Sequence, residues 1–424
     1  MVQLTDDCFA FSGPLMPLAE MERLIAERIK PVAETERVSL AAARSRVVAA
    51  DISAPVNLPP FDNSAVDGYA VRHADLNSSG ETRLKVAGRL MAGQGTKNAF
   101  GNAEAVRIFT GAPMPQGADT VLMQEDVRVE ADAVIVPSGL KAGANRRLAG
   151  EDLRAGAVAL SGGTVLDAPQ IALAAALGLT DIEVRRRLRV AIFSTGDEVV
   201  EPGSARGPAA IFDANRFLLA QLLGHMGALV TDLGILPDDP ETLARAIGEA
   251  ATRHDLVLTT GGVSTGEADY VRDAVERVGK LVFWRVAIKP GRPVAMGVLR
   301  GANNGEPAAF MGLPGNPVAV FVTFVRVVRP LMQRLAGALP RPLMALPVRT
   351  AFAYRKKKGR REYVRVALRR RADGEIEAVK HPQDGAGVIT SLTETDGLLE
   401  FADDVTDVAA GDRAGFLSYA VLMG

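Results

Sequence analysis

The chain has 424 residues, 48% of them hydrophobic, so it is long enough to bury the cores of several globular domains. Its 49 lysines and arginines are balanced by 50 aspartates and glutamates, which excludes a protein-wide basic surface for nucleic acid. A single cysteine, Cys8, excludes an internal disulfide and a cysteine-rich zinc site. The start of the chain has no signal-peptide pattern, and the apolar run 318–325 is too short to span a bilayer. We therefore expect a cytoplasmic protein without nucleic-acid or membrane partners.

The first part of the chain predicts a helix followed by a small β-rich domain. Apolar residues at helical spacing over 17–30 predict an amphipathic helix. A proline-rich stretch at 54–60 is typical of entry into a new domain. Short β-like runs separated by glycines follow, and they predict a small β-rich domain over 53–149.

A second helix is predicted after this β-rich domain. Asp167 stands at its expected start, a proline follows in the first turn, and Gly178 stands just past its end. Packing of residues 150–187 beside 15–52 would make the β-rich domain an insertion. The sequence pattern alone leaves this packing open.

From residue 188 onward, predicted strands and helices alternate. Strands are predicted at 188–193, 229–236 and 256–259, and helices at 214–226 and 241–253. This alternation is typical of a doubly wound, mostly parallel sheet, which we place over 188–336. Alternating apolar residues over 362–368 predict that the remainder, 337–424, is a small β domain.

The most informative local motif is the segment 259–269, which contains Thr, Ser, Glu and Asp among its glycines and directly follows a buried strand. Ligands of open parallel sheets bind beyond the carboxyl ends of strands, where glycines let backbone N–H groups approach an anion. A tight turn without a ligand would also use glycines. The interleaved polar residues favour binding, and the candidate residues are Thr260, Gly261, Gly262, Ser264 and Gly266.

Pairs of carboxylates follow three successive predicted strands. The pairs are Asp197/Glu198, Asp238/Asp239 and Glu267/Asp269. Because the strands are expected to be parallel, the pairs should meet at one rim of the sheet, where hard oxygen ligands suit Mg²⁺. Helix capping is the alternative for each aspartate, and Asp239 before Pro240 is expected to be a cap.

Two proline- and glycine-rich loops, 288–293 and 312–317, predict a rigid rim. Lys289 and Arg292 in the first loop offer positive charge to an oxyanion, although solvated surface charge is the alternative for each. Six of the seven residues over 355–361 are basic. Since no aromatic stacking pattern accompanies this run, we interpret it as a solvated hairpin turn rather than a site for RNA or membrane.

Taken together in chain order, seven motifs resemble the MoeA/gephyrin E-domain family of molybdopterin molybdenumtransferases. They are Phe61-Asp-Asn-Ser-Ala-Val-Asp-Gly-Tyr-Ala-Val71, Thr110-Gly-Ala-Pro, Gly150-Glu-Asp-Leu-Arg-Ala-Gly156, Ser194-Thr-Gly-Asp-Glu198, Thr260-Gly-Gly-Val-Ser-Thr-Gly-Glu-Ala-Asp269, Lys289-Pro-Gly-Arg-Pro293 and Leu313-Pro-Gly-Asn-Pro317. Each motif is weak alone, but their joint occurrence across nearly the whole chain is highly specific.

The resemblance implies a multidomain α/β fold in an elongated homodimer. Residues 15–52 with 150–187 would form an elongated, helix-containing linker and dimerisation domain, and 188–336 a molybdopterin-binding domain similar to that of the molybdopterin adenylyltransferases. The implied reaction inserts molybdate into adenylylated molybdopterin with the help of Mg²⁺, releasing AMP and giving molybdenum cofactor. Molybdopterin adenylyltransferase and apo-molybdoenzymes are the expected partners.

The resemblance also implies the functional residues. The catalytic residues would be Asp67, Thr110, Asp152, Glu198, Asp238 and Asp269. Added to the glycine loop, the residues that bind molybdopterin and molybdate would be Lys289, Arg292, Pro314, Pro317 and Arg365. Glu198 and Asp269 would hold Mg²⁺. The implied cleft combines the 188–336 domain of one subunit with C-terminal residues, above all Arg365, of the other.

Two positions depart from the family pattern. Arg292 stands where lysine is common, and Ala386 stands where a serine is thought to help hold molybdate. Two alternatives follow. One is a gephyrin-like scaffold that has lost turnover, which Ala386 favours and the retained carboxylates oppose. The other is a molybdopterin adenylyltransferase, which the Val263-Ser264 wording of the glycine loop disfavours because those enzymes typically have Thr-Gly there.

Overall fold

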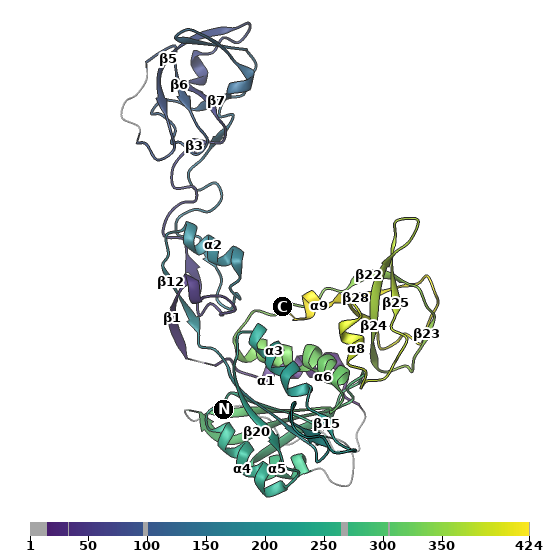
Figure 1. Ribbon diagram of the computed structural model, residues 1–424. Coiled ribbons are helices and arrows are strands. Elements are labelled where there is room, and N and C mark those ends of the chain that lie inside the picture. Colours follow the sequence, from purple (N-terminus) through teal and green to yellow (C-terminus); the bar gives the residue numbers. More distant parts are fainter. Residues whose placement is uncertain (1–14, 33, 96–100, 264–269, 304–305, 424) are drawn as a thin grey trace.

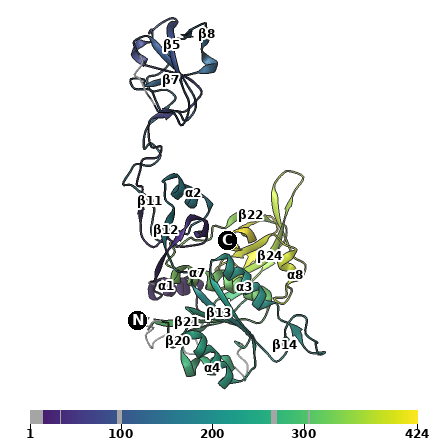
Figure 2. The ribbon, with the colours of Figure 1, turned by 60° about the vertical axis from the view of Figure 1, so that its left-hand side comes forward.

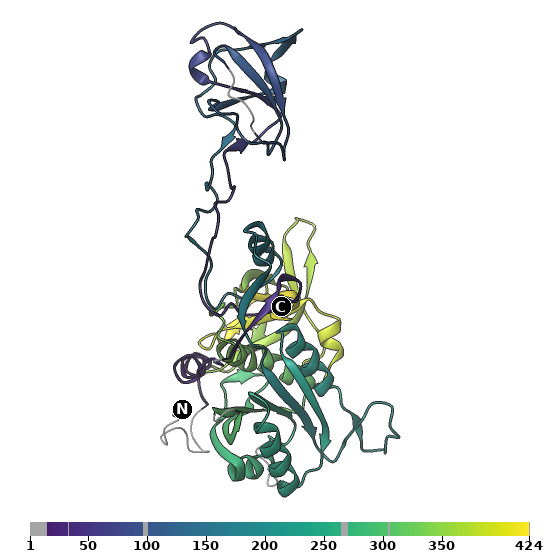
Figure 3. The ribbon, with the colours of Figure 1, turned by 90° about the vertical axis from the view of Figure 1, so that its left-hand side faces the viewer.

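The computed structural model describes residues 15–423 apart from 33, 96–100, 264–269 and 304–305. The molecule is elongated, with a β-rich body at one end joined to the rest by a pair of extended segments (Figure 1). Rotated views keep this distal body apart from the rest of the chain (Figure 2 and Figure 3). The predicted fold class, multidomain α/β with a β-rich insertion and a C-terminal β part, is confirmed.

The distal body is built around one sheet with the strand order β7-β4-β6-β5-β9-β8. The strands are β4 (Gly68–Val71), β5 (Thr82–Leu90), β6 (Glu104–Ile108), β7 (Thr120–Met123), β8 (Arg128–Glu130) and β9 (Ala133–Val136). Alternating side chains such as Leu84, Leu122 and Val134 form its core. Short pairings of β3 (Asn63–Ser64) with β10 (Arg146–Arg147) close the base of this body.

A small linker body lies between the distal body and the α/β sheet (Figure 1). Its strand β1 (Thr35–Ser39) pairs antiparallel with β12 (Asp181–Arg185), so the two outer segments of the N-terminal half do lie side by side. β2 (Ile52–Ser53) pairs with β11 (Val158–Leu160) at the start of the extended connection. Helix α2 (Ala168–Ala176) covers this body and starts after Asp167, the predicted N-cap, which forms a capping box with Gln170.

The α/β part contains a mixed sheet with the order β16-β13-β17-β21-β20-β18. Its strands are β13 (Arg189–Thr195), β16 (Leu229–Leu236), β17 (Leu256–Thr260), β18 (Gly279–Arg285), β20 (Pro293–Asn303) and β21 (Glu306–Leu313). The first four strands of this order are parallel, and β20 and β18 run antiparallel to their neighbours. A short pair, β14 (Val199–Val200) with β15 (Ile211–Phe212), projects from the end of β13.

Helices cover both faces of this sheet (Figure 1). α4 (Pro240–Ala251) and α5 (Tyr270–Val278) share one core with it, and α1 (Leu18–Arg28), α3 (Asn215–His225), α6 (Pro317–Thr323) and α7 (Arg329–Leu335) share the other. α6 runs through a π-helical turn, η4 (Phe324–Val328), into α7. The apolar run 318–325 is therefore a buried helical segment, and no described helix is long and apolar enough to cross a membrane.

The C-terminal part forms a sheet that closes on itself. Its strands are β22 (Leu346–Thr350), β24 (Arg361–Arg370), β25 (Ile376–Lys380), β26 (Gly397–Phe401) and β28 (Arg413–Ser418). β24 pairs with both β25 and β26, and this pairing closes the ring. Two short helices, α8 (Thr390–Thr393) and α9 (Tyr419–Met423), flank it.

The basic run 355–361 contains an exposed turn, as expected, but the prediction that it forms a hairpin is wrong. The run links β23 (Tyr354–Arg355) to β24, but β23 pairs with β27 (Asp407–Val408), not with β24. Lys356 is buried, and its ammonium donates hydrogen bonds to the backbone carbonyls of Ala402 and Val405 at 2.8 and 2.6 Å. Because backbone carbonyls accept the hydrogen bonds of this ammonium, Lys356 stabilises the fold and is not a solvated surface charge.

Candidate active site

A cleft of about 410 Å³ separates the loop 288–293 of the α/β part from strand β24 of the C-terminal sheet. The start of α6 and the loop that contains Ala386 complete its walls. The charged side chains that line it are Lys289, Arg292, Arg360, Arg365, Glu362 and Asp384. Four cations against two carboxylates leave an excess of positive charge, which makes the cleft a candidate site for an anion.

The loop 288–293 is held against the C-terminal sheet by its backbone. β19 (Ile288–Lys289) pairs parallel with β24, and the N–H of Arg361 donates to the carbonyl of Ala287 at 2.9 Å. Gly291 has a φ of +107°, and a Cβ there would lie 2.4 Å from the Cγ2 of Thr323 on α6. Only glycine allows the loop to approach α6 this closely.

Glu362 is a buried carboxylate at the centre of the cleft wall, with a relative exposure of 1%. Its oxygens accept hydrogen bonds from the Tyr354 hydroxyl at 2.7 Å, the Arg360 Nε at 2.7 Å and the Lys289 Nζ at 3.2 Å. A buried carboxylate needs such partners. Since Lys289 and Arg360 come from different parts of the fold, Glu362 fixes both cations at one point.

The charge state of Glu362 follows from these contacts. Burial alone would raise the pKa of Glu362, but the hydrogen bonds from Tyr354 and Arg360 and the charge of Lys289 outweigh it and lower the pKa. Burial, together with the same carboxylate, raises the pKa of the Tyr354 hydroxyl. Glu362 is therefore an anion and Tyr354 a neutral donor at neutral pH.

Arg365 holds the loop on the opposite wall of the cleft. Its Nε donates to the Ser391 hydroxyl at 3.1 Å, and its Nη2 donates to the carbonyls of Gln383 and Gly385 at 3.0 and 3.1 Å. Burial lowers the pKa of this guanidinium. Within the described chain no acceptor bonds its Nη1, so two N–H donors stay available to a ligand in the cleft.

Arg365 and the loop 288–293 line the same cleft within a single chain. The expectation that Arg365 would come from the other subunit is therefore wrong, because β19 and β24 pair within the chain and bring the two walls together. The exposed Arg292 and the buried Pro314 also line this cleft. Pro317 begins α6 and is not a lining residue.

Ala386 lies at the cleft itself. Its backbone carbonyl accepts a hydrogen bond at 3.0 Å from the N–H of Val318, in the first turn of α6. The methyl group therefore occupies the position at which the resemblance expects a serine hydroxyl. Any oxyanion bound here has to be held by other donors.

The glycine loop after β17 joins this cleft through a hydrogen-bond chain. The Thr260 hydroxyl donates to the carbonyl of Pro314 at 3.0 Å, and the Asn215 side chain donates to Thr260 and to the carbonyl of Gly315 at 2.9 and 2.6 Å. The carboxyl ends of β16, β13 and β17 lie side by side because these strands are parallel neighbours. The predicted rim of strand ends is therefore present among the described residues.

Close packing, not an approaching anion, accounts for two glycines of this loop. A Cβ on Gly261 would lie 2.3 Å from the carbonyl oxygen of Thr195, and one on Gly262 would lie 2.5 Å from the Cγ2 of Val271. Both glycines have positive φ angles, +89° and +64°. The turn needs glycine here whether or not a ligand binds.

The predicted carboxylate rim is described only in part. Asp239 caps α4 by accepting from the N–H of Thr242 at 2.8 Å, as predicted. Asp238 accepts a hydrogen bond from the hydroxyl of Thr195. The side chain of Glu198 is exposed. Among the described residues, no group of three His, Cys, Asp or Glu residues could hold a metal ion. The candidates Ser264, Gly266 and Asp269 lie outside the described residues.

Three predicted catalytic residues lie away from the cleft of their own chain. Asp67 and Thr110 belong to the distal body, where the N–H and hydroxyl of Thr110 both donate to Asp67 at 2.8 Å. These hydrogen bonds lower the pKa of Asp67. Asp152 lies in the extended connection, where its N–H donates to the carbonyl of Leu58. The chain brings Asp67 and Thr110 together, but brings neither to the cleft (Figure 1).

Family comparisons match three consecutive parts of the chain. They are the MoeA N-terminal region (domain I and II) over 16–178, the probable molybdopterin binding domain over 191–334, and the MoeA C-terminal region (domain IV) over 347–418. A Haemophilus influenzae protein named molybdopterin molybdenumtransferase is 37% identical over 414 residues, or 97% of this chain and 100% of the relative. The chain belongs to the MoeA family.

Other members of the MoeA family also align with nearly the whole chain. Molybdopterin molybdenumtransferase 2 of Mycobacterium tuberculosis is 34% identical, covering 93% of this chain and 97% of the relative. The crystal structure of a MoeA protein from Pyrococcus horikoshii superposes with a TM-score of 0.77 at 29% identity, covering 96% of this chain and all of that one. The resemblance read from the motifs is confirmed.

Sequence reasoning missed several cleft residues of this MoeA-family chain. Glu362, Tyr354, Arg360 and Asp384 were not singled out. Arg360 was treated as part of a solvated charge run, and Glu362 as one polar position in an alternating strand. A glutamate directly after a basic run, at the start of a strand, was the available signal for an ion-paired carboxylate.

Proposed function

We propose that this MoeA-family chain inserts molybdate into adenylylated molybdopterin, releasing AMP and giving molybdenum cofactor, at the cleft between the loop 288–293 and β24. Relatives named molybdopterin molybdenumtransferase that align over nearly its whole length support the reaction. The observation that carries the location is the joint anchoring of Lys289 and Arg360 by Glu362, which builds a fixed cationic wall from two parts of the fold.

The cleft residues act in this proposal by binding and orienting anions. The free Nη1 of Arg365 and the exposed guanidinium of Arg292 can each present N–H donors to an oxyanion. Lys289, held by Glu362, supplies a fixed positive charge beside them. Molybdate, the pterin dithiolate and the phosphates are all negatively charged, so such preorganised cations reduce the repulsion that opposes their approach.

We also propose that Mg²⁺ assists at the rim of the α/β sheet, held by Glu198 and Asp269 together with substrate phosphate. Mg²⁺ commonly uses one or two carboxylates plus phosphate oxygens, so a larger cluster is not required. The Glu198 carboxylate fits this role because it is exposed and takes no hydrogen bond from the described side chains. The bound metal would neutralise charge on the phosphate bond that is cleaved when AMP leaves.

The proposed assembly is a homodimer in which the distal body of one subunit completes the cleft of the other. This arrangement is supported by the location of Asp67 and Thr110 in the distal body, which Figure 1 shows apart from the rest of the chain. If these residues act in the reaction, they have to act on a second copy. Two copies related by a two-fold axis would exchange distal bodies equally.

The cellular setting is proposed on the same basis. Molybdopterin adenylyltransferase would supply the adenylylated substrate, and apo-molybdoenzymes would accept the product, in the cytoplasm. The near-zero net charge of -1 supports small-molecule substrates over nucleic acid. The domain boundaries 15–52 with 150–187, 53–149, 188–336 and 337–424 also remain predictions.

Two incubations separate the candidate functions. The purified chain is mixed with adenylylated molybdopterin, Mg²⁺ and molybdate, and both AMP and active cofactor are measured. Molybdate-dependent release of both products supports the transferase. Binding of the substrate without AMP release would support a scaffold. In the second incubation, with ATP and molybdopterin in place of the adenylylated substrate, formation of adenylylated molybdopterin would support an adenylyltransferase.

A further inference from the structure

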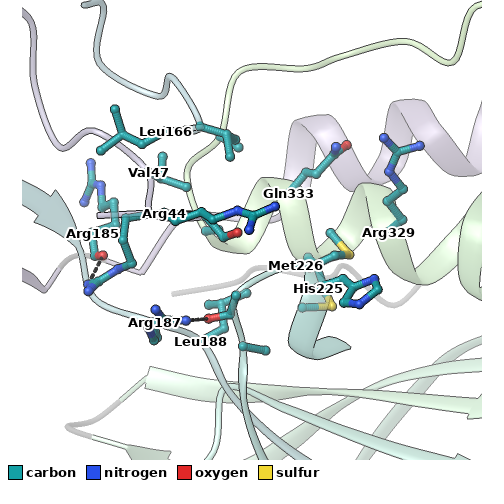
Figure 4. Close-up of a pocket in the computed structure, with 18 of the residues that line it drawn as sticks. Arg44, Val47, Leu166, Arg185, Arg187, Leu188, His225, Met226, Arg329 and Gln333 are labelled. Carbon is teal, nitrogen blue, oxygen red and sulfur yellow. Dashed lines mark hydrogen bonds between the residues drawn. The ribbon is translucent and has the colours of Figure 1, made fainter. Parts of the chain in front are cut away.

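A second cavity, of about 580 Å³, lies where three parts of the chain meet. Its walls come from the linker body at 44–47, 165–167 and 185–188, from the end of α3, and from α7 with the segment after it. Leu422 and Met423 of α9 complete it. We name it the junction pocket; Figure 4 shows Arg44 extending across it between Gln333 and Met226.

The junction pocket is strongly cationic. The arginines that line it are Arg44, Arg46, Arg185, Arg186, Arg187, Arg329 and Arg341, and Asp167 is the one carboxylate among its described lining residues. Some of these charges are neutralised locally, because Arg46 pairs with Glu36 and Arg186 pairs with Asp255. After these ion pairs are counted, the pocket still has an excess of positive charge.

Three of these arginines lack a carboxylate partner within the described chain. Arg187 donates only to the carbonyl of Gly227, at 3.0 Å, and no ion pair joins Arg329 or Arg341 to a described carboxylate. Arg44 reaches Asp167 only at 3.7 Å, with both side chains largely exposed, so that pair is weak. Several cationic groups of the pocket are therefore open to an anion.

Arg329 is the most unusual of the three. Its Nη1 is buried yet has no hydrogen-bond partner. Burial, together with the nearby charges of Arg326 and Arg341, lowers the pKa of this guanidinium, although arginine remains charged at neutral pH. A buried, unpaired N–H donor on a charged group destabilises a fold, so its presence indicates a missing partner.

We propose that the junction pocket binds a small organic phosphate, with the phosphate beside Arg329 and an apolar body against Leu166 and Met226. A guanidinium can donate two parallel hydrogen bonds to a phosphate. Several unpaired arginines match the charge of a phosphate dianion better than that of a singly charged carboxylate ligand. The pocket volume lies within the ~300–1000 Å³ that is usual for small-molecule sites.

The position of the junction pocket gives the bound phosphate a structural consequence. Its walls belong both to the linker body and to the α/β part, so one ligand contacts both. Binding would hold the linker body, and with it the distal body, in a fixed orientation on the α/β part. The inference does not depend on the proposed reaction, since it concerns a separate cavity that shares no lining residue with the cleft.

Binding of three probes to the full-length chain tests this proposal by calorimetry. The probes are phenyl phosphate, inorganic phosphate and phenol. We expect phenyl phosphate to bind more tightly than either of the others. Arg329→Gln should weaken the binding of phenyl phosphate by about 10-fold or more, because a hydrogen bond between charged groups is lost. Arg341→Gln should weaken it less. Arg253→Gln, at an exposed arginine outside the pocket, is the matched control.

Thermal unfolding without oxyanions gives a second readout. If Arg329 awaits a ligand, Arg329→Gln should melt at the same temperature as the wild type or higher, because an unpaired buried charge is removed. Phenyl phosphate should raise the melting temperature of the wild type but not that of Arg329→Gln. Equal affinity of Arg329→Gln and Arg253→Gln for phenyl phosphate would overturn the proposal. So would a lower melting temperature of Arg329→Gln without ligand, or a loss of dimer affinity with unchanged phenyl phosphate binding.

Discussion

At the scale of single residues, the cleft depends on how one buried carboxylate is used. Glu362 is almost fully buried, yet it satisfies donors from Tyr354, Arg360 and Lys289 instead of contacting solvent. Two long, flexible side chains are thereby fixed before any ligand arrives. Preorganised cations of this kind contribute more to anion binding than free surface charges do.

Replacing Glu362 with glutamine tests this role. The amide keeps the size of the side chain but removes the charge, and its NH₂ group meets donors instead of accepting from them. We expect Glu362→Gln to lower kcat/KM for cofactor formation by ~10–100-fold, as expected for loss of charge-assisted hydrogen bonds. Glu375→Gln, at an exposed glutamate of the same domain, should leave kcat/KM unchanged. Equal activity of both variants would contradict the positioning role.

The pH dependence of stability provides an independent check on Glu362. Its pKa in the folded chain is lower than the ordinary value of 4.5, so its ionised form stabilises the fold. This stabilisation is complete above pH 4.5 and is lost as the pH falls through the folded pKa. The difference in unfolding free energy between wild type and Glu362→Gln should therefore stay constant from neutral pH down to about pH 5 and then shrink. A difference that grows on acidification would have the wrong sign.

Ala386 offers a test of the departure from the family pattern. Its methyl group lines the cleft, and its carbonyl is already used by Val318. A neutral hydroxyl adds a modest hydrogen bond, so Ala386→Ser should lower the molybdate concentration for half-maximal insertion by up to ~10-fold. Ala372→Ser, at an exposed position of the same domain, is the control. An unchanged molybdate titration would remove Ala386 from the molybdate site.

At the scale of elements, the cleft arises from strand pairing that crosses two parts of the chain. β19 follows β18 of the α/β sheet along the chain but pairs with β24, so Ile288 and Lys289 form an edge of the C-terminal sheet. Across the cleft, Arg365 on β24 ties the loop 383–385 through two carbonyls. Strand β24 therefore positions both walls of the cleft.

Arg365→Lys tests whether this guanidinium acts through its fork shape or only its charge. Lysine keeps the charge but cannot reach Ser391, Gln383 and Gly385 together with a ligand. We expect the molybdate concentration for half-maximal insertion to rise by ~10-fold or more, since several bonds to a charged donor are lost. Arg370→Lys, at the exposed end of the same strand, should behave as wild type. If Arg365→Lys also titrates as wild type, molybdate is held elsewhere.

The sequence predicted those elements whose patterns are local. The capping residues of α2 and α4 and the apolar strands β13 and β17 all appear where expected. The pairing of β19 with β24 could not be predicted, since it joins segments far apart in sequence through two residues each. For the same reason Glu362 was missed, because its partners Lys289 and Tyr354 become neighbours only in the folded chain.

At the scale of the whole molecule, the elongated shape limits which residues can act together. Lys289 and Arg365 line one cleft within a chain, whereas Asp67 belongs to the distal body at the other end (Figure 1). A homodimer would combine Asp67 of one subunit with Arg365 of the other. Pairs of inactive variants should therefore complement each other or fail to do so according to where their residues lie.

Mixing Asp67→Asn with Arg365→Ala should restore activity if the distal body completes a partner's cleft. In a mixed dimer, the cleft of the Asp67→Asn subunit has an intact Arg365 and receives an intact Asp67 from the other subunit. Random exchange makes half of the dimers mixed, each with one of its two sites intact, so recovery should approach about a quarter of wild-type activity. Activity of unmixed and mixed samples is compared after subunit exchange has been verified.

Mixing Lys289→Ala with Arg365→Ala is the matched control, because both residues belong to one cleft of the same chain. Every site of that mixed dimer carries one defect, so no activity should return. Recovery in this second mixture would mean that the two walls of a working cleft come from different subunits. Failure of the first mixture despite exchange would mean that Asp67 does not act on a partner, and the proposed use of the distal body would be wrong.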